Sequence, residues 1–194
     1  MSRKCITQSF LIAATSVVLF GCQPQKMDME KMMQPVERPA ELERLNVFVG
    51  TWEGTAMVKM AGSEEYTESH GKETYEWGAD KWVLITHGEY EAGEGQVMRG
   101  YGYWRWDPEA KHYATMWFES DGGVNEGVVT YNEATQMWKF IGKSHNPYTG
   151  MKTVGEGTMK VVDDRTMEWT WEAEIPSLFG AKPLMKMQGT SLKQ

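Results

Sequence analysis

The side chains that offer the most chemistry in this sequence are apolar and aromatic, because its 194 residues include 9 tryptophans and 15 methionines. An indole brings a large apolar area with one N–H donor, and a thioether adapts to guests of irregular shape. These residues alternate with polar ones in several segments, which predicts that they share one face of a strand. We expect the following residues to face inward and to line a cavity: Trp52, Trp104, Trp106, Met116, Trp169, Trp171 and Met187. Such a lining suits a small hydrophobic ligand, and the alternative that these side chains simply fill the interior stays open.

Catalytic motifs are missing from the sequence. It contains no Gly-x-Ser-x-Gly elbow, no His-Glu-x-x-His and no Cys-x-x-Cys. The four histidines lack the spacing of metal ligands, and the alternation that places His87 with Glu89 and His70 with Lys72 indicates a solvated exterior. We therefore expect no enzyme activity, no metal and no cofactor. An isomerase-like or hydrolase-like enzyme would need a buried carboxylate or histidine with a shifted pKa.

Length and composition indicate one globular domain. The formal net charge is −7, which argues against a nucleic-acid-binding protein, since such proteins carry a basic patch. Hydrophobic residues make up 41% and charged residues 24%, the balance of a folded chain rather than a disordered one. Two cysteines are too few for a disulfide framework.

The first 40 residues have the composition of a targeting segment and a tether. Arg3 and Lys4 precede an apolar run over residues 10–20, which is too short to span a bilayer and fits the core of a signal peptide. The run ends Leu19-Phe20-Gly21-Cys22, which resembles a bacterial lipobox. The resemblance implies a lipoprotein: removal of residues 1–21, acylation of Cys22 with palmitate-like chains, and a membrane anchor. Gln23 after the cysteine favours the periplasmic face of the outer membrane by the same resemblance. Residues 22–40 are expected to form a flexible lipidated linker.

From residue 50 onward the sequence predicts an all-β domain, which we place at residues 41–194. Segments of period-two alternation recur with turn residues between them, and Met167–Ile175 is the clearest, with apolar residues at every odd position. A short helix is expected to begin near Ala40, where Leu42, Leu45 and Val49 share a face. About ten strands are expected, at 51–60, 66–77, 82–91, 96–106, 111–119, 124–131, 136–145, 152–162, 165–175 and 183–192. Strands this short, with tight connections, favour an antiparallel up-and-down barrel over a two-sheet sandwich.

Glycines and turn residues support the barrel. Asp107 and Asn132 each follow an aromatic residue and open a short polar turn, which predicts that their side chains bond to the backbone of that turn. Glycines within the predicted strands suit bends and close approaches in a barrel wall, namely Gly71, Gly100, Gly102, Gly155 and Gly157.

An ordered series of short motifs resembles a known family. Gly50-Thr51-Trp52 resembles the opening of calycin barrels such as lipocalins, and the series resembles the bacterial family called domain of unknown function 1579. Its further motifs are Arg99-Gly100-Tyr101-Gly102, Trp106-Asp107, Trp117 to Gly122, Glu126-Gly127 and Pro147-Tyr148-Thr149-Gly150. The resemblance covers residues 42–190 and implies a calycin-like barrel. It adds little chemistry, because the family is uncharacterised. Some calycin barrels bind heme through a late histidine, but none follows His145 here.

Three functions remain, in order of preference. The first is an envelope lipoprotein that binds a fatty acyl-like or other small hydrophobic ligand inside the barrel. The second is a non-enzymatic structural or interaction lipoprotein with a filled barrel and an unidentified protein partner. The third is an enzyme with a buried carboxylate or histidine.

Overall fold

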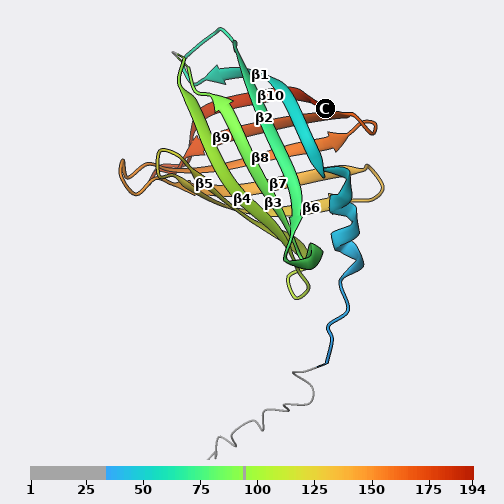
Figure 1. Ribbon diagram of the computed structural model, residues 1–194. Helices are drawn as coiled ribbons and strands as arrows, with labels where there is room; N and C mark the ends of the chain where they lie inside the picture. The colour runs from blue at the N-terminus through green and yellow to red at the C-terminus, as the bar shows by residue number, and fades with distance from the viewer. Residues whose placement is uncertain (1–33, 94) are drawn as a thin grey trace, which may run out of the picture. The chain divides into compact units, whose positions relative to one another are not determined.

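The computed structural model describes residues 34–93 and 95–194, so the predicted signal peptide and Cys22 lie outside the described residues. Glu37–Gln194 forms one compact unit. Its ten antiparallel strands run up and down in chain order and close into a barrel, because β1 pairs with both β2 and β10 (Figure 1). The elements are η1 (Ala40–Val47), β1 (Gly50–Met60), β2 (Thr67–Gly78), η2 (Ala79–Lys81), β3 (Val83–Glu91), β4 (Val97–Asp107), β5 (His112–Glu119), β6 (Val124–Asn132), β7 (Met137–His145), β8 (Lys152–Val161), β9 (Thr166–Ile175) and β10 (Lys182–Lys193).

The predicted all-β barrel of ten strands is confirmed, and each strand begins and ends within one residue of its predicted bounds. Closure gives every strand two hydrogen-bonded neighbours, which removes the unpaired edges of an open sheet. The helical segments η1 and η2 are both 3-10 helices. No helix in the described part of the chain is long and apolar enough to cross a membrane.

The two predicted polar turns form as expected. The Asp107 carboxylate accepts hydrogen bonds from the backbone N–H groups of Glu109 and Ala110, at 3.1 and 3.0 Å. The Asn132 side-chain oxygen does the same for the corresponding two residues of its own turn, at 3.0 and 3.2 Å. Both turns then close through a residue with positive φ, Lys111 or Gln136. The side chain of the first residue thus fixes each hairpin.

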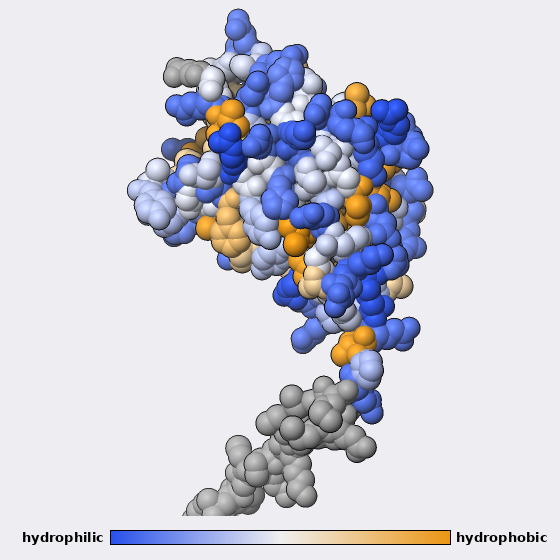
Figure 2. All heavy atoms as spheres, viewed as in Figure 1, coloured by the Kyte–Doolittle hydropathy of each residue, from blue (hydrophilic) through white to orange (hydrophobic). Residues whose placement is uncertain are grey.

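Strand pairing defines which residues face the interior. Residues paired across neighbouring strands point to the same side of the sheet, and alternate residues of one strand point to opposite sides. Trp52, Leu84, Tyr113 and Val129 are at most 1% exposed, so their side is the interior. On the face shown in Figure 2 the outer surface is mostly hydrophilic, and hydrophobic residues appear on it in small separate groups.

One end of the barrel, called here the η1 end, is filled by aromatic side chains. β1 begins and β2 ends there, next to η1 (Figure 1). Phe48, which follows η1 and is 0% exposed, lies inside this end. Its ring centroid is 5.0 Å from that of Trp138, 5.3 Å from that of Trp104 and 5.9 Å from that of Tyr75. Tilted and edge-to-face contacts at these distances are the favourable arrangements of aromatic rings, and they leave this end filled.

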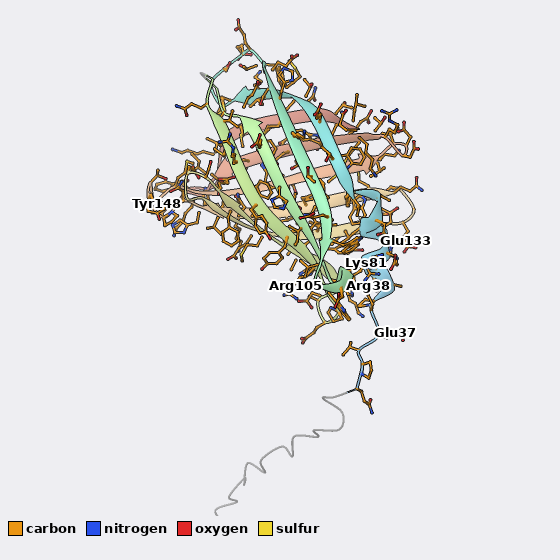
Figure 3. The ribbon with its side chains drawn as sticks, viewed as in Figure 1. Glu37, Arg38, Lys81, Arg105, Glu133 and Tyr148 are labelled. Atoms are coloured by element: carbon orange, nitrogen blue, oxygen red, sulfur yellow. The ribbon has the colours of Figure 1, made fainter. Side chains whose placement is uncertain are left out.

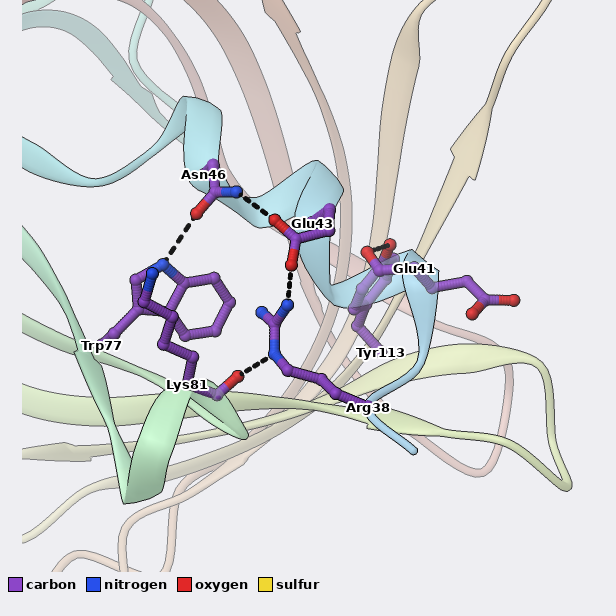
Figure 4. A network of polar contacts seen from close by, with 7 residues as sticks. All are labelled: Arg38, Glu41, Glu43, Asn46, Trp77, Lys81 and Tyr113. Carbon is purple, nitrogen blue, oxygen red and sulfur yellow. Dashed lines mark hydrogen bonds and ion pairs between the residues drawn. The ribbon is translucent and has the colours of Figure 1, made fainter. Parts of the chain in front are cut away.

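A chain of polar contacts fixes η1 against this end of the barrel (Figure 4). The indole N–H of Trp77 donates to the Asn46 side-chain oxygen at 2.8 Å, and the Asn46 amide donates to Glu43 at 2.6 Å. Arg38 pairs with Glu43 and also donates to the backbone carbonyl of Lys81 in η2, at 2.7 Å. Because these contacts connect η1 with β2 and η2, they hold Phe48 in the barrel.

Candidate functional site

The opposite end of the barrel, called here the far end, is built differently. It is the end where β1, β3, β5, β7 and β9 finish, and Tyr148 lies on its β7–β8 loop, away from Arg38, Lys81 and Glu133 at the η1 end (Figure 3). In the half of the interior next to the far end, called the far half, indoles lie flat against the barrel wall. A Cβ added at Gly100 would be 2.0 Å from Cζ2 of Trp117, and one added at Gly155 would be 2.4 Å from Cζ2 of Trp171.

Glycine is what permits this arrangement, because any side chain at these positions would occupy the space of the ring. The predicted close approaches are confirmed, since a Cβ would come within 3 Å of a neighbour at every predicted position: Gly71, Gly100, Gly102, Gly155 and Gly157. The wall is therefore covered by flat indole faces rather than filled by side chains that point to the barrel axis.

Solvent reaches the lining of the far half. Trp117, Trp171 and Met187 face inward by their pairing, yet each is only partly buried. At the η1 end, Trp52 and Trp138 are 1% and 2% exposed. Burial is thus most complete at the η1 end, although Trp77, Trp106 and Tyr131 are also partly buried there, and the lining of the far half keeps some exposed surface.

A carboxylate held by two tyrosines lies at the boundary between the two halves. The hydroxyl of Tyr75 donates to one oxygen of Glu73 at 2.6 Å, and the hydroxyl of Tyr90 donates to the other. Burial, followed by the charge of Glu73, raises the pKa of both phenols well above the ordinary value. Both tyrosines therefore remain protonated donors, and they fix the Glu73 carboxylate inside the barrel.

Two further polar residues on β3 and β5 also face the interior. Glu119, at the end of β5, faces inward and accepts a hydrogen bond from the Asn125 amide at 2.9 Å. Burial raises the pKa of the Glu119 carboxyl. Thr86 pairs with Tyr75, faces inward and is 3% exposed, and its hydroxyl has no hydrogen-bond partner in the described part of the chain.

In the part of the chain that the structure describes, basic groups form no ion pair with these carboxylates, although Lys193 and Glu73 both pair with Trp52, from its two sides. Among the inward positions of the described strands, lysines occur at the two ends of β10, and arginines at none. Lys182 is exposed where β10 begins, and Lys193 lies at the η1 end with its Nζ 5.4 Å from the centroid of the Trp52 ring. Neither Glu73 nor Glu119 forms an ion pair with any described residue.

The outer wall carries two grooves of ≈ 490 Å³ each, which differ in character from the interior. The first crosses β1, β2 and β3, where Lys72 and Glu53 pair at 3.5 Å. Both of these side chains are more than half exposed, and exposed ion pairs of this kind are common on solvated surfaces. The interior of the far half, with its aromatic walls and few polar groups, is the better candidate site.

The histidines do not contribute to this site. His70, His87, His112 and His145 all alternate with inward residues and so face outward, as expected for His70 and His87. Within residues 34–93 and 95–194, no group of three or more His, Cys, Asp or Glu side chains is arranged to hold a metal ion.

The structure divides the predicted lining residues into three groups. Trp171 and Met187 face the interior of the far half and are partly buried. Trp52 and Trp104 are buried in the filled η1 end, and Trp106 and Trp169 pack against that core. Met116 faces outward instead, where its sulfur lies 3.8 Å from the Tyr103 hydroxyl, so its placement in the lining was wrong. Within β5 the interior positions belong to Tyr113, Thr115, Trp117 and Glu119, one residue out of phase with the prediction.

Sequence reasoning missed the polar residues and one of the two tryptophans of the far half. Trp117 and Glu119 would have been predicted to face inward if the odd-numbered residues of β5 had been assigned to the interior. Glu73, Tyr90 and Thr86 carried no distinct signal, because their convergence depends on the register of β2 against β3.

Comparison with known proteins supports the fold. No family model matches the chain, and no curated protein matches it in sequence, so the resemblance to the family of unknown function stays a prediction. The crystal structure of Rv2717c from M. tuberculosis is similar, with a TM-score of 0.62 and 12% identity over 81% of this chain and 99% of that one. The S-type phycobiliprotein lyase CPES from Guillardia theta has a TM-score of 0.55 and 12% identity over 88% of this chain and 98% of its own. These likenesses support a calycin-like barrel fold.

Proposed function

We propose that this chain is a binding protein that holds a small hydrophobic molecule in the far half of its barrel. The observation that carries the proposal is the accessible interior in which Trp117 and Trp171 lie flat on glycine walls. Indole side chains that already lie against the wall lose little conformational entropy when a guest binds, and their exposed faces offer it a large apolar area. A fatty acyl-like chain is our candidate for the apolar part of that guest.

The fold alone does not carry this function, because barrels of one fold host different activities. One structural neighbour, for example, is named as a phycobiliprotein lyase. The proposal rests instead on a contrast within this barrel. The η1 end is packed with buried aromatic side chains, whereas the far half is lined by indole rings that are only partly buried.

We also propose that the chain is a lipoprotein anchored through Cys22 to the periplasmic face of the outer membrane. The support is the lipobox-like sequence before Cys22 and the proline-containing stretch that follows it. Two or more acyl chains anchor a protein stably where one does not. The binding barrel would then remain tethered next to a source of hydrophobic guests.

The binding proposal is tested by titrating the purified, delipidated chain with the neutral apolar dye N-phenylnaphthylamine and following dye emission. Saturable binding is expected for the natural chain. Ser144→Phe places a ring into the far half, since Ser144 faces inward next to Asn125, and it should weaken binding at least about tenfold. Thr130→Phe on the outer face of β6 is the matched control and should leave binding unchanged.

Two results would contradict the proposal. One is a flat titration of the natural chain across several neutral apolar dyes, which would favour the alternative of a structural lipoprotein with a filled barrel. The other is saturable binding that Ser144→Phe and Thr130→Phe affect equally, which would place the dye outside the far half.

A further inference from the structure

The far half contains charged groups that an apolar guest alone does not explain. Glu73 pairs with Gly88, Gly88 with Gly100, and Gly100 with Glu119, so the two glutamates lie at the ends of one row of residues across β2 to β5. Both face inward. Burial, then the charge of Glu73 and, last, that of Glu119 raise the pKa of the Tyr90 hydroxyl, so both carboxylates act on this one group. The interior thus holds two acidic groups around one tyrosine.

These carboxylates lack a basic partner within the protein. Hydrogen bonds from Tyr75 and Tyr90 orient Glu73, and one from Asn125 orients Glu119, but such donors carry no net charge. The inward-facing lysines are at the ends of β10, and neither pairs with Glu73 or Glu119. A guest that displaces water from the far half strengthens the attraction of a carboxylate for its cation, so a bound cation gains more here than on the outer surface.

The hydroxyl of Thr86 gives an independent indication of a polar guest atom. Thr86 is 3% exposed, faces inward next to Tyr75, and its oxygen has no partner among the described residues. Buried hydroxyls without a partner are unfavourable, and most buried polar groups in proteins have one. A guest N–H or O–H that donates to this oxygen would satisfy it.

The aromatic lining fits the same guest. The faces of Trp117 and Trp171 are directed away from the glycine wall and toward the interior. Indole faces attract cations through their quadrupole, most strongly where water is excluded. A cationic group therefore meets favourable neighbours both at the carboxylates and at the walls.

We propose that the guest carries a positively charged nitrogen, as an amine or ammonium group, on an apolar body, and that the inward carboxylates of Glu73 and Glu119, with the Thr86 hydroxyl as a further acceptor, favour this nitrogen over a neutral or anionic group. The inference rests on the proposed function and specifies the class of ligand. It also states a preference against free fatty acids, because their carboxylate would be repelled by both glutamates.

The test compares three ligands with the same alkyl chain, namely laurylamine, lauryl alcohol and laurate, by calorimetry on the delipidated chain at neutral pH. All three are kept below the concentrations at which they aggregate. Laurylamine should bind about tenfold or more tightly than lauryl alcohol, since a charge-assisted hydrogen bond is stronger than a neutral one, and laurate should bind most weakly.

Variants locate the preference. Glu119→Gln should reduce the ratio of amine to alcohol affinity about tenfold, and Glu73→Gln should do the same if it folds. Glu76→Gln is the matched control, because Glu76 lies on β2 like Glu73 but faces outward, where its carboxylate is near His87. Thr86→Val should lower amine affinity while it raises the free energy of unfolding, a combination that a purely structural role would not give.

The outcomes separate the two proposals. If none of the three ligands binds, the proposed function fails and the present inference fails with it. If lauryl alcohol or laurate binds as tightly as laurylamine, or if Glu119→Gln and Glu76→Gln behave alike, the binding function stands and the preference for a cation is overturned.

Discussion

Replacement of Gly100 by alanine tests the arrangement of indole on glycine. The new Cβ would lie 2.0 Å from Cζ2 of Trp117, closer than any carbon contact allows, so the ring must leave the wall. Overpacking of this kind typically destabilises by about 1–3 kcal/mol. The smaller backbone freedom of alanine in the unfolded chain offsets about 0.4–1 kcal/mol of this. We expect a net loss of about 1–2 kcal/mol in the free energy of unfolding, measured by urea denaturation.

The control is Gly142→Ala, another inward-facing strand glycine. Its added Cβ would lie 3.2 Å from Cη2 of Trp171 and 3.6 Å from the backbone oxygen of Glu126, distances that a small shift relieves. The free energy of unfolding should therefore change by less than about 0.5 kcal/mol or increase.

A double-mutant cycle isolates the cause of the loss. In the background of Trp117→Ala the ring is gone, so Gly100→Ala should no longer destabilise the chain, and the coupling should be about 1–2 kcal/mol. If Gly100→Ala destabilises by the same amount with and without the ring, or no more than Gly142→Ala does, the proposed contact is not what requires glycine.

Three further predictions concern Phe48 in the η1 end, the inward Glu119 carboxyl and the proposed anchor at Cys22. Phe48→Ala should destabilise by about 3–5 kcal/mol because Phe48 is 0% exposed among aromatic rings, whereas Val47→Ala, at 42% exposure, should change stability by less than about 0.5 kcal/mol in the same denaturation assay. Burial raises the pKa of Glu119, so the folded chain holds more protons than the unfolded chain between the ordinary and the raised values, and the contribution of this group to stability falls as pH rises through that window. Glu119→Gln should therefore stabilise at neutral pH and lose this advantage below the ordinary pKa of glutamate, and a pH-independent difference would contradict the effect of burial. Cys22→Ser should move the chain from the membrane fraction to the soluble fraction and abolish labelling by an alkyne-bearing palmitate analogue, and unchanged fractionation would contradict the anchor.

The fold followed from sequence because its strands obey a local rule. Segments such as Met167–Ile175 alternate apolar and polar residues without interruption. Only a strand places such alternating side chains on two opposite faces, with the apolar ones toward a core and the polar ones toward solvent. Asp107 and Asn132 marked their turns by chemistry that acts within three residues. Closure followed from the number of strands and their tight connections.

The site was harder to predict because it depends on phase and register. In β5, residues on both faces are apolar or aromatic, including Met116, Trp117 and Phe118, so hydrophobicity did not distinguish inside from outside. The Tyr75–Glu73–Tyr90 contacts join neighbouring strands at a register that no local pattern specifies. Glycines were predicted as points of close approach, but the sequence did not show which rings approach them.

The most direct measurement of the central claim is the set of intermolecular nuclear Overhauser effects between bound laurylamine and the aromatic ring protons of the protein. Contacts are expected from the alkyl chain to Trp117 and Trp171, and none to Tyr101, which is 46% exposed and alternates with the inward residues of β4. Contacts confined to Tyr101 and other outward residues, with Trp117 and Trp171 unaffected, would show that the barrel interior is not the binding site.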